Sequence, residues 1–198
     1  MAATTISGID KNQNPCAARA DGNVLAVSVS GFRATYRYLA TDFTPVATAT
    51  DVLTITGSST KVIRVTRVAV SGTAAAASIY SASIVKRTTA NTGGTSSAPS
   101  PVSSDSTDPT ATATLKLYTA NATGLGTGAS FDGAKVYLPA NSSPTSMQQL
   151  KEFLYGNDGD KAITLRGVNE SLSINFNGGA VPAGTLLYLA FEWTEDDV

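Results

Sequence analysis

The chain has no histidine, one cysteine, and only 15% charged residues among its 198. Histidine is the side chain whose unperturbed pKa lies nearest neutral pH, and histidine and cysteine supply most ligands of structural zinc sites. Their scarcity excludes Ser-His-Asp and Cys-His catalysis, because the base is missing. The composition favours a scaffold or binding protein, and we expect no enzyme activity, no cofactor and no metal.

An excess of charge of one sign is also lacking. Fourteen basic and 15 acidic residues leave a formal net charge of -1, so no long-range field would attract nucleic acid or anionic lipid. With so few charges, the surface must consist largely of Ser, Thr, Asn, Gly and Ala. Neutral hydroxyls and amides cost less to bury than charged groups, which suits a subunit that packs against other subunits.

Long apolar runs are absent too. The longest, Leu186–Phe191, is far too short to cross a bilayer, and the first 20 residues show no apolar core of a secretory signal. We therefore expect synthesis in a cytoplasm and no membrane partner. Cys16 has no second cysteine for an intramolecular disulfide and no neighbouring base to activate its thiol, so we expect a spectator thiol in a reducing compartment.

What is present is a pattern of strands and turns that changes character near residue 30. Met1–Gly22 mixes Gly, Asn and Pro with little periodicity, which favours irregular or extended structure, and a short strand follows within Asn23–Ser30. We expect residues 1–30 to form an extended N-terminal arm, either disordered or ordered by a neighbour. Residues 31–198 should form one β-sandwich domain.

Alternating apolar residues between turn signals predict the strands of that domain. They are Arg33–Leu39, Asp51–Thr56, Lys61–Ser71, Ser78–Arg87, Ala113–Thr119, Ala134–Leu138, Ala162–Gly167, Ser171–Asn177 and Leu186–Thr194. Ser146–Tyr155 fits a helix or a strand, and we favour a strand. This succession of short strands without a long helix predicts an all-β, antiparallel β-sandwich, of jelly-roll type.

Three segments need separate predictions. Lys61–Ser71 is apolar on both faces, so it should be a central strand or a strand whose faces are exchanged by a bulge. The Ser/Thr-rich segment Thr88–Thr110 has too few apolar residues to order itself, so we expect a long exposed loop or one fixed by a partner. Asn121–Ser130 contains a Gly-x-Gly-x-Gly pattern whose spacing does not fit a dinucleotide-binding loop; we expect a flexible loop.

Two patterns could carry catalysis. Ser58 and Lys61 match the S-x-x-K arrangement of a serine nucleophile and a lysine base, but that arrangement needs a helix and these residues lie in a turn. Glu152, Glu170 and Glu192 are carboxylates of the kind that hydrolyse glycosidic bonds in pairs, yet no spacing selects a pair. We expect none of these residues to be catalytic.

Two further patterns could bind a ligand. Asn157–Asp160 clusters oxygen ligands but departs from the calcium-loop pattern, and Asp-Gly is equally a hairpin signal, so we favour a turn over a metal site. Tyr36 with Tyr38, and Phe191 with Trp193, could form a platform for stacking sugars. Alternate aromatic residues on a strand usually face the core, which is the role we predict.

The charged residues form a basic and an acidic group. Lys61, Arg64 and Arg67 lie close in sequence, but strand alternation should turn Arg64 away from the other two and weaken a phosphate-binding row. The acidic residues are Glu192, Glu195, Asp196 and Asp197. We expect a solvated tail, with salt bridges to the basic group of a neighbouring subunit as the alternative.

Four parts of the chain together span most of residues 33–196: Ala34–Arg37, Asp51–Gly72, Ile84–Thr95 and the stretch from Leu165–Gly167 through Pro182–Gly184 to Glu192–Glu195. These segments resemble a group of small virion-associated proteins encoded by tailed bacteriophages and their prophages. The resemblance implies a phage structural protein. Phage jelly rolls of this size commonly act as capsid decoration or cement proteins.

The resemblance thus implies a partner, an oligomer and a location. The partner is the major capsid protein, and the oligomer is a homotrimer seated where capsid hexamers and pentamers meet. The location is the capsid surface of the virion, after assembly in the host cytoplasm. The alternative is a tail- or fibre-associated module that binds a receptor or glycan, although no repeat or coiled-coil shaft is visible in the sequence.

Overall fold

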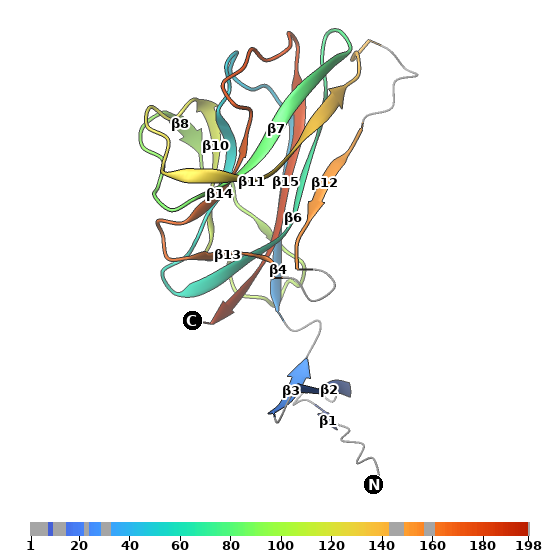
Figure 1. Cartoon of the computed structure of the whole chain (residues 1–198), viewed down its shortest axis with the longest axis vertical. Coiled ribbons are helices and arrows are strands. Elements are labelled where there is room, and N and C mark those ends of the chain that lie inside the picture. The colour runs from blue at the N-terminus through green and yellow to red at the C-terminus, as the bar shows by residue number, and fades with distance from the viewer. Residues whose placement is uncertain are drawn as a thin grey trace. The chain divides into compact units, whose positions relative to one another are not determined.

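The described part of the chain is built from strands. The computed structural model describes residues 33–142, 149–156 and 161–197 with their side chains, and the backbone of residues 8–9, 15–21 and 24–28. No helix occurs in these residues, which confirms the predicted all-β class (Figure 1). The predicted turn Asn157–Asp160 and the side chain of Cys16 lie outside the described residues.

The first of two compact units is Met1–Arg33. It contains the antiparallel strands β1 (Gly8–Ile9), β2 (Pro15–Asp21) and β3 (Val24–Ser28). Strand β3 lies within the predicted strand Asn23–Ser30, and β2 occupies residues for which we predicted irregular or extended structure without naming a strand. The alanine-rich sequence of β2 has no alternation of large apolar side chains, which is the signal that reveals a strand.

The second unit, Ala34–Val198, holds two antiparallel sheets. Sheet I has the order β11-β7-β14-β5-β10-β8, and its strands are β5 (Asp51–Thr56), β7 (Ser78–Arg87), β8 (Thr95–Ser97), β10 (Thr114–Ala120), β11 (Gly128–Leu138) and β14 (Ser171–Asn175). Sheet II has the order β12-β6-β15-β4-β9, with β13 also paired to β6. Its strands are β4 (Ala34–Phe43), β6 (Lys61–Thr73), β9 (Val102–Ser103), β12 (Lys151–Leu154), β13 (Ile163–Arg166) and β15 (Leu186–Asp197).

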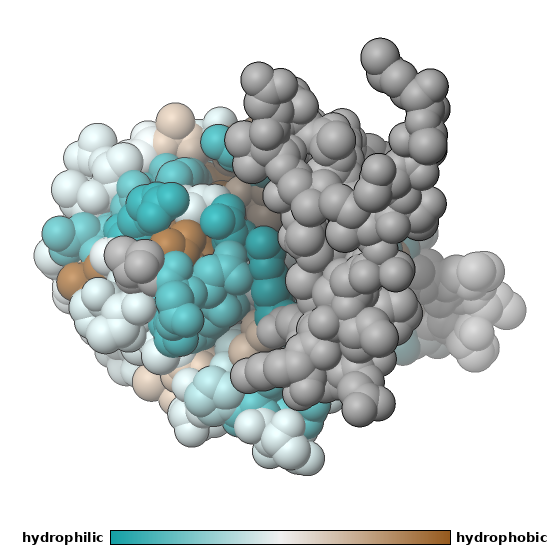
Figure 2. Space-filling view, turned by 90° about the horizontal axis from the view of Figure 1, so that it is seen from below, coloured by the Kyte–Doolittle hydropathy of each residue, from teal (hydrophilic) through white to brown (hydrophobic). Residues whose placement is uncertain are grey.

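Side chains from both sheets fill the space between them. Every second residue of β15 is buried, as its alternating sequence predicted, and Trp193 is fully enclosed. One apolar cluster contains Trp193 of sheet II together with Leu172 and Ile84 of sheet I, so the two sheets form a β-sandwich. On the outside, the end of the molecule in Figure 2 shows small apolar patches among near-neutral and hydrophilic residues.

Strand β6 is both central and bulged, so both alternatives predicted for it are confirmed. It lies between β15 on one side and β12 and β13 on the other. Ile63 and Val65 face the core in its first half, and Val68 and Val70 do so in its second half. The register with β15 shifts at Thr66: Val65 pairs with Trp193 and Arg67 with Glu192, so Thr66 is an extra residue without a partner position on β15. Because of this bulge, odd-numbered residues of β6 face the core before Thr66 and even-numbered residues face it afterwards.

Several strand bounds differ from those predicted. Strand β11 begins at Gly128, inside the segment expected to be a flexible loop. The sequence did not reveal this start, because the first residues of β11 are small and exposed and show no apolar alternation. They are held in the strand by pairing with β7. Residues 151–154 form a strand, as favoured over a helix. Neighbouring strands in both sheets are distant in sequence, but the described order does not confirm a jelly roll, which stays a prediction.

The Ser/Thr-rich segment Thr88–Thr110 is exposed, as predicted, and is fixed by the chain itself. Strand β8 pairs with β10 at the edge of sheet I, and β9 pairs with β4 at the edge of sheet II. The Tyr36 hydroxyl also donates to the Pro109 carbonyl, at 2.7 Å. The segment therefore links the two sheets along one side of the sandwich.

Candidate binding surfaces

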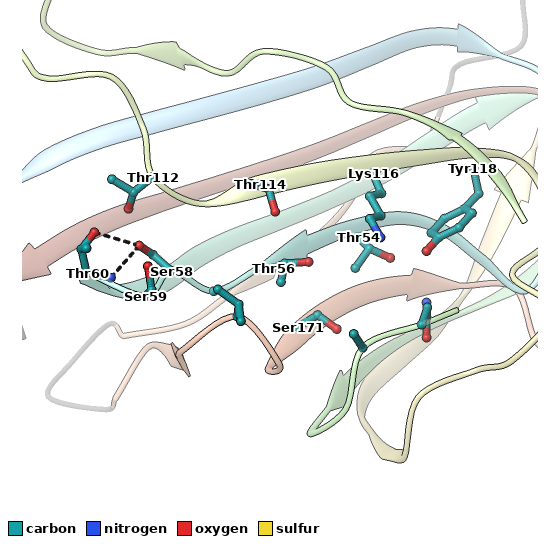
Figure 3. Close-up of a pocket in the computed structure, with 14 residues that line it drawn as sticks. Thr54, Thr56, Ser58, Ser59, Thr60, Thr112, Thr114, Lys116, Tyr118 and Ser171 are labelled. Atoms are coloured by element: carbon teal, nitrogen blue, oxygen red, sulfur yellow. Dashed lines mark hydrogen bonds between the residues drawn. The ribbon is translucent and has the colours of Figure 1, made fainter. Parts of the chain in front are cut away.

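A polar groove lies on the outer face of sheet I. The strand register aligns two rows across β10, β5 and β14, namely Thr114–Thr56–Ser171 and Lys116–Thr54–Ser173. Because alternate residues of a strand share a face, these side chains project together. All except Ser173 line a groove of about 360 Å³, whose walls include the turn Ser58–Thr60 and the loop residue Asn91 (Figure 3).

Several polar groups in this groove have no partner within the described residues. Thr54 Oγ1 is 2.9 Å from Ser173 Oγ, so that pair is satisfied. Among the described residues, the hydroxyls of Thr56 and Thr114 make no hydrogen bond, and Ser171 Oγ is buried without a partner there. The Lys116 ammonium likewise has neither an ion pair nor a hydrogen bond in the described part of the chain. The groove therefore offers hydroxyl groups and one positive charge.

A buried ion pair holds the loop wall of this groove. Arg87 at the end of β7 donates to both Asp51 carboxylate oxygens at 2.7 Å, and to the Gly126 carbonyl at 2.6 Å. Asn91 donates to Asp51 at 2.6 Å and accepts from the Gly126 backbone at 2.8 Å. Asn175 donates the remaining bond to Asp51, at 2.6 Å. The loop predicted to be flexible is thus fastened to the sheet by a satisfied polar network.

The electrostatics of this network favour the ionised carboxylate. Burial alone would raise the pKa of Asp51, but hydrogen bonds from Arg87, Asn175 and Asn91 outweigh it and hold the pKa below its ordinary value. The side chains of Arg87 and Asp51 are 6% and 0% exposed. Such a pair is stable only while both partners are present.

The second candidate surface is an apolar hollow on the outer face of sheet II, of about 240 Å³. The register places Ala69 of β6 beside Ala190 of β15, and Ala190 beside Leu39 of β4. Leu150 and Tyr188 complete the wall. Leu39 and Leu150 are 56% and 53% exposed, which is unusual for large apolar side chains gathered on one face.

Ion pairs flank the hollow. Arg37 Nε lies 2.8 Å from Glu192, and Arg67 Nε lies 2.7 Å from Glu152. The prediction that Arg64 points away from Arg67 is wrong. The bulge at Thr66 places both arginines on the outer face of the sheet, where Arg64 pairs with Thr194 and Arg67 with Glu192 of β15. Basic and acidic side chains therefore alternate across four strands, in the order Arg37 on β4, Glu192 on β15, Arg67 on β6 and Glu152 on β12.

The acidic C-terminal segment is a strand within the fold, so the prediction of a solvated tail is wrong. Glu195 is buried; it accepts from the backbone of Thr112 and Ala113 and, at 3.1 Å, from the Trp193 indole. Asp196 and Asp197 pair within the chain, with Arg64 at 2.5 Å and with Lys61. The basic and acidic groups therefore do meet, as the alternative supposed, but inside one subunit.

The residues tested for serine chemistry do not form a nucleophile and base. Ser58 Oγ accepts the backbone N–H of Thr60 at 3.1 Å and of Lys61 at 3.3 Å, which is a local turn cap. The Lys61 ammonium binds Asp197 instead, and this hydrogen bond raises the pKa of Lys61. A lysine held in its charged form cannot accept a proton from Ser58.

Each of the three candidate carboxylates is paired with a different basic residue. Glu152 binds Arg67 and Glu192 binds Arg37, on different strands of sheet II. Glu170 lies in the turn before β14, where it accepts the Arg166 N–H at 2.9 Å and lies 3.5 Å from Lys86. No two of the three bind a common partner in the described residues.

The aromatic residues considered as a sugar platform lie in the core or against it. Tyr36 stacks on Trp193 with ring centroids 5.9 Å apart, and Phe191 is 1% exposed. Tyr38 is partly buried against the same cluster. The core role predicted for these four side chains is therefore confirmed.

The described residues contain neither a cluster of metal ligands nor a membrane-spanning helix. Within residues 33–142, 149–156 and 161–197, no three His, Cys, Asp or Glu side chains gather as metal ligands. Among the residues that the structure covers, no helix is long and apolar enough to span a membrane.

Comparison of the chain with protein-family models, with curated proteins and with solved structures gave no match. The two outer faces therefore provide the structural basis for a functional hypothesis.

Proposed function

We propose that this chain is a structural protein of a phage virion, namely a capsid decoration or cement protein that binds between major capsid subunits and stabilises the head. The segments within residues 33–196 that resemble phage virion proteins support this proposal. The structural observation that carries it is the outer face of sheet II. That face has an apolar hollow and four large apolar side chains that are each more than half exposed: Leu39, Val102, Leu150 and Leu154.

Exposed apolar patches of this kind mark protein interaction sites. Burying each large apolar side chain would contribute about 1.5–3 kcal/mol. The neighbouring charges are already neutralised in pairs, with Arg37 on Glu192 and Arg67 on Glu152, so a partner need not supply every counter-charge. The partner that fits is a protein surface with an apolar side chain that projects into the hollow.

The mechanism is stabilisation by selective binding. A stable contact of this type buries at least about 1,000 Å² in total. If the subunit, as a trimer, binds the expanded capsid lattice and not its precursor, binding raises the stability of the expanded lattice by mass action. No covalent chemistry is required.

The test is to mix the purified protein with undecorated, DNA-free heads of the phage that encodes it, and to count bound copies per head. We expect saturable binding with a fixed copy number. The double substitution Leu39→Asp with Leu150→Asp should weaken binding by at least about tenfold, which corresponds to about 1.4 kcal/mol.

The matched control is Ile79→Asp, because Ile79 is 67% exposed on sheet I and lies outside the hollow. Thermal melting checks that all variants fold. The proposal is contradicted if the wild-type protein does not bind heads, or if the folded double variant binds them as well as the wild type does.

A further inference from the structure

We infer that the groove on the outer face of sheet I is a binding site for a hydroxylated carboxylate, the chemistry of a sugar acid such as a hexuronate. This inference does not depend on the proposed function, because the groove and the apolar hollow lie on different sheets.

The first argument is the charge of Lys116. Six other basic residues hold carboxylates: Arg37, Lys61, Arg64, Arg67, Lys86 and Arg87. Lys116 has no such partner in the described residues, and its side chain extends from β10 toward Thr54 in the groove (Figure 3). An unpaired ammonium beside a groove binds a carboxylate more strongly than a neutral group.

The second argument is the set of hydroxyls next to that charge. Thr56 and Thr114 face each other across β5 and β10, and Ser171 follows on β14. Their hydroxyls have no partner within the described residues. Each hydroxyl donates one hydrogen bond and accepts two. A ligand that bears hydroxyl groups matches both capacities, whereas a simple anion only accepts.

The third argument is size and the lack of a stacking surface. A volume of about 360 Å³ lies within the range of small-molecule sites, roughly 300–1,000 Å³. Tyr118 is the aromatic residue of the groove, and it is only 3% exposed, so it offers no ring face to a neutral sugar. Recognition must therefore depend on the carboxylate at Lys116 and on the hydroxyl rows.

The fourth argument is preorganisation. The wall residue Asn91 is fixed by Asp51 and by the Gly126 backbone, and Arg87 fixes both of these groups. The groove thus exists before a ligand arrives, which lowers the entropy lost on binding.

The experiment is a titration of the full-length protein with sodium D-glucuronate, D-glucose and sodium acetate, followed by NMR chemical shifts. We expect saturable shifts with glucuronate, and at least tenfold weaker binding of both glucose and acetate. Lys116→Met should abolish binding. Its control is Lys135→Met, because Lys135 binds Ser81 on β7, outside the groove.

Three outcomes would overturn the inference: no binding of glucuronate, equal binding of glucose or acetate, or unchanged binding by Lys116→Met. A short glucuronate oligosaccharide distinguishes the two sources of the ligand. Tighter binding of the oligosaccharide indicates a polysaccharide residue, and equal binding indicates the free acid. Head binding by Lys116→Met should remain normal, so failure here and failure of the proposed function are distinguishable.

Discussion

Asp51 and Arg87 connect the sandwich to the two irregular segments that contain Asn91 and Gly126. Neither residue stands out in the sequence, because Asp51 simply opens an apolar strand and Arg87 ends another. In the structure each is almost fully buried, and together they bind Asn91, Asn175 and Gly126. A sequence pattern could not predict this network, because strand order brings together residues up to 124 positions apart.

The first prediction at this scale is the loss of stability on breaking the pair. Arg87→Met leaves the Asp51 carboxylate buried without its counter-charge, so the free energy of unfolding should fall by about 3–5 kcal/mol. Arg37→Met, at a 64% exposed side chain paired with Glu192, should cost at most about 1 kcal/mol. Urea unfolding measures both. Equal losses for the two variants would show that the buried pair has no special role.

The second prediction concerns acid. The pKa of Asp51 is lower in the folded chain than its ordinary value of 3.8, so ionised Asp51 contributes its full stability above that value. The contribution is lost as pH falls below 3.8 and passes through the folded pKa. The difference in unfolding free energy between wild type and Asp51→Asn should therefore shrink below about pH 4. A difference that stays constant from about pH 7 to about pH 2 would contradict the assignment.

Among the elements, β6 shows what alternation can and cannot predict. Its doubly apolar sequence indicated a central or bulged strand, and both features are present. The position of the bulge at Thr66 was not predictable, and with it the shared face of Arg64 and Arg67 was missed. By contrast, β5 and β7 have the predicted bounds, because each has clear alternation and a turn at its end.

The groove was missed for a related reason. The patterns T-x-T in β5, T-x-K in β10 and S-x-S in β14 are visible in the sequence, and each places polar side chains on one face. What the sequence does not show is that β10, β5 and β14 are neighbours. Once the strand order is known, the signal for such a groove is a set of neighbouring strands in which polar residues alternate with core residues.

The bulge gives the prediction at the scale of elements. Deleting Thr66 removes the extra residue while Val65 and Val68 keep their inward directions. We expect the fold to persist with a loss of about 1–3 kcal/mol, because Thr66 also accepts the Tyr155 backbone N–H. Deleting Arg64 instead should reverse the faces of Lys61–Ile63 and prevent folding. Circular dichroism and soluble yield would compare them, and similar behaviour of the two deletions would contradict the parity argument.

At the scale of the whole molecule, the apolar core formed by the side chains that the structure describes belongs to the second unit. Every member of the apolar cluster has a number of 34 or higher, and the chain divides at Arg33. Since a domain with its own core can fold alone, residues 34–198 should melt cooperatively. We expect a melting temperature within about 4 °C of the full chain, equivalent to about 1 kcal/mol. Calorimetry measures this, and loss of cooperative melting would show that residues 1–33 complete the fold.

The two sheets have outer faces of different chemistry. Sheet II presents exposed Leu39 and Leu150 beside paired charges, and sheet I presents hydroxyl rows beside Lys116. We interpret the apolar face as the side that meets other subunits and the polar face as the side open to small ligands. This division of roles is the central claim.

Because we propose that a phage encodes this chain, cryo-electron microscopy of the virions of that phage is the most direct test of the role assigned to sheet II. The account predicts density for the sandwich at regular positions on the capsid lattice, in a fixed copy number, with the outer face of sheet II against a capsid subunit. Virions that lack the protein, or a bound sandwich whose sheet II faces solvent, would contradict it.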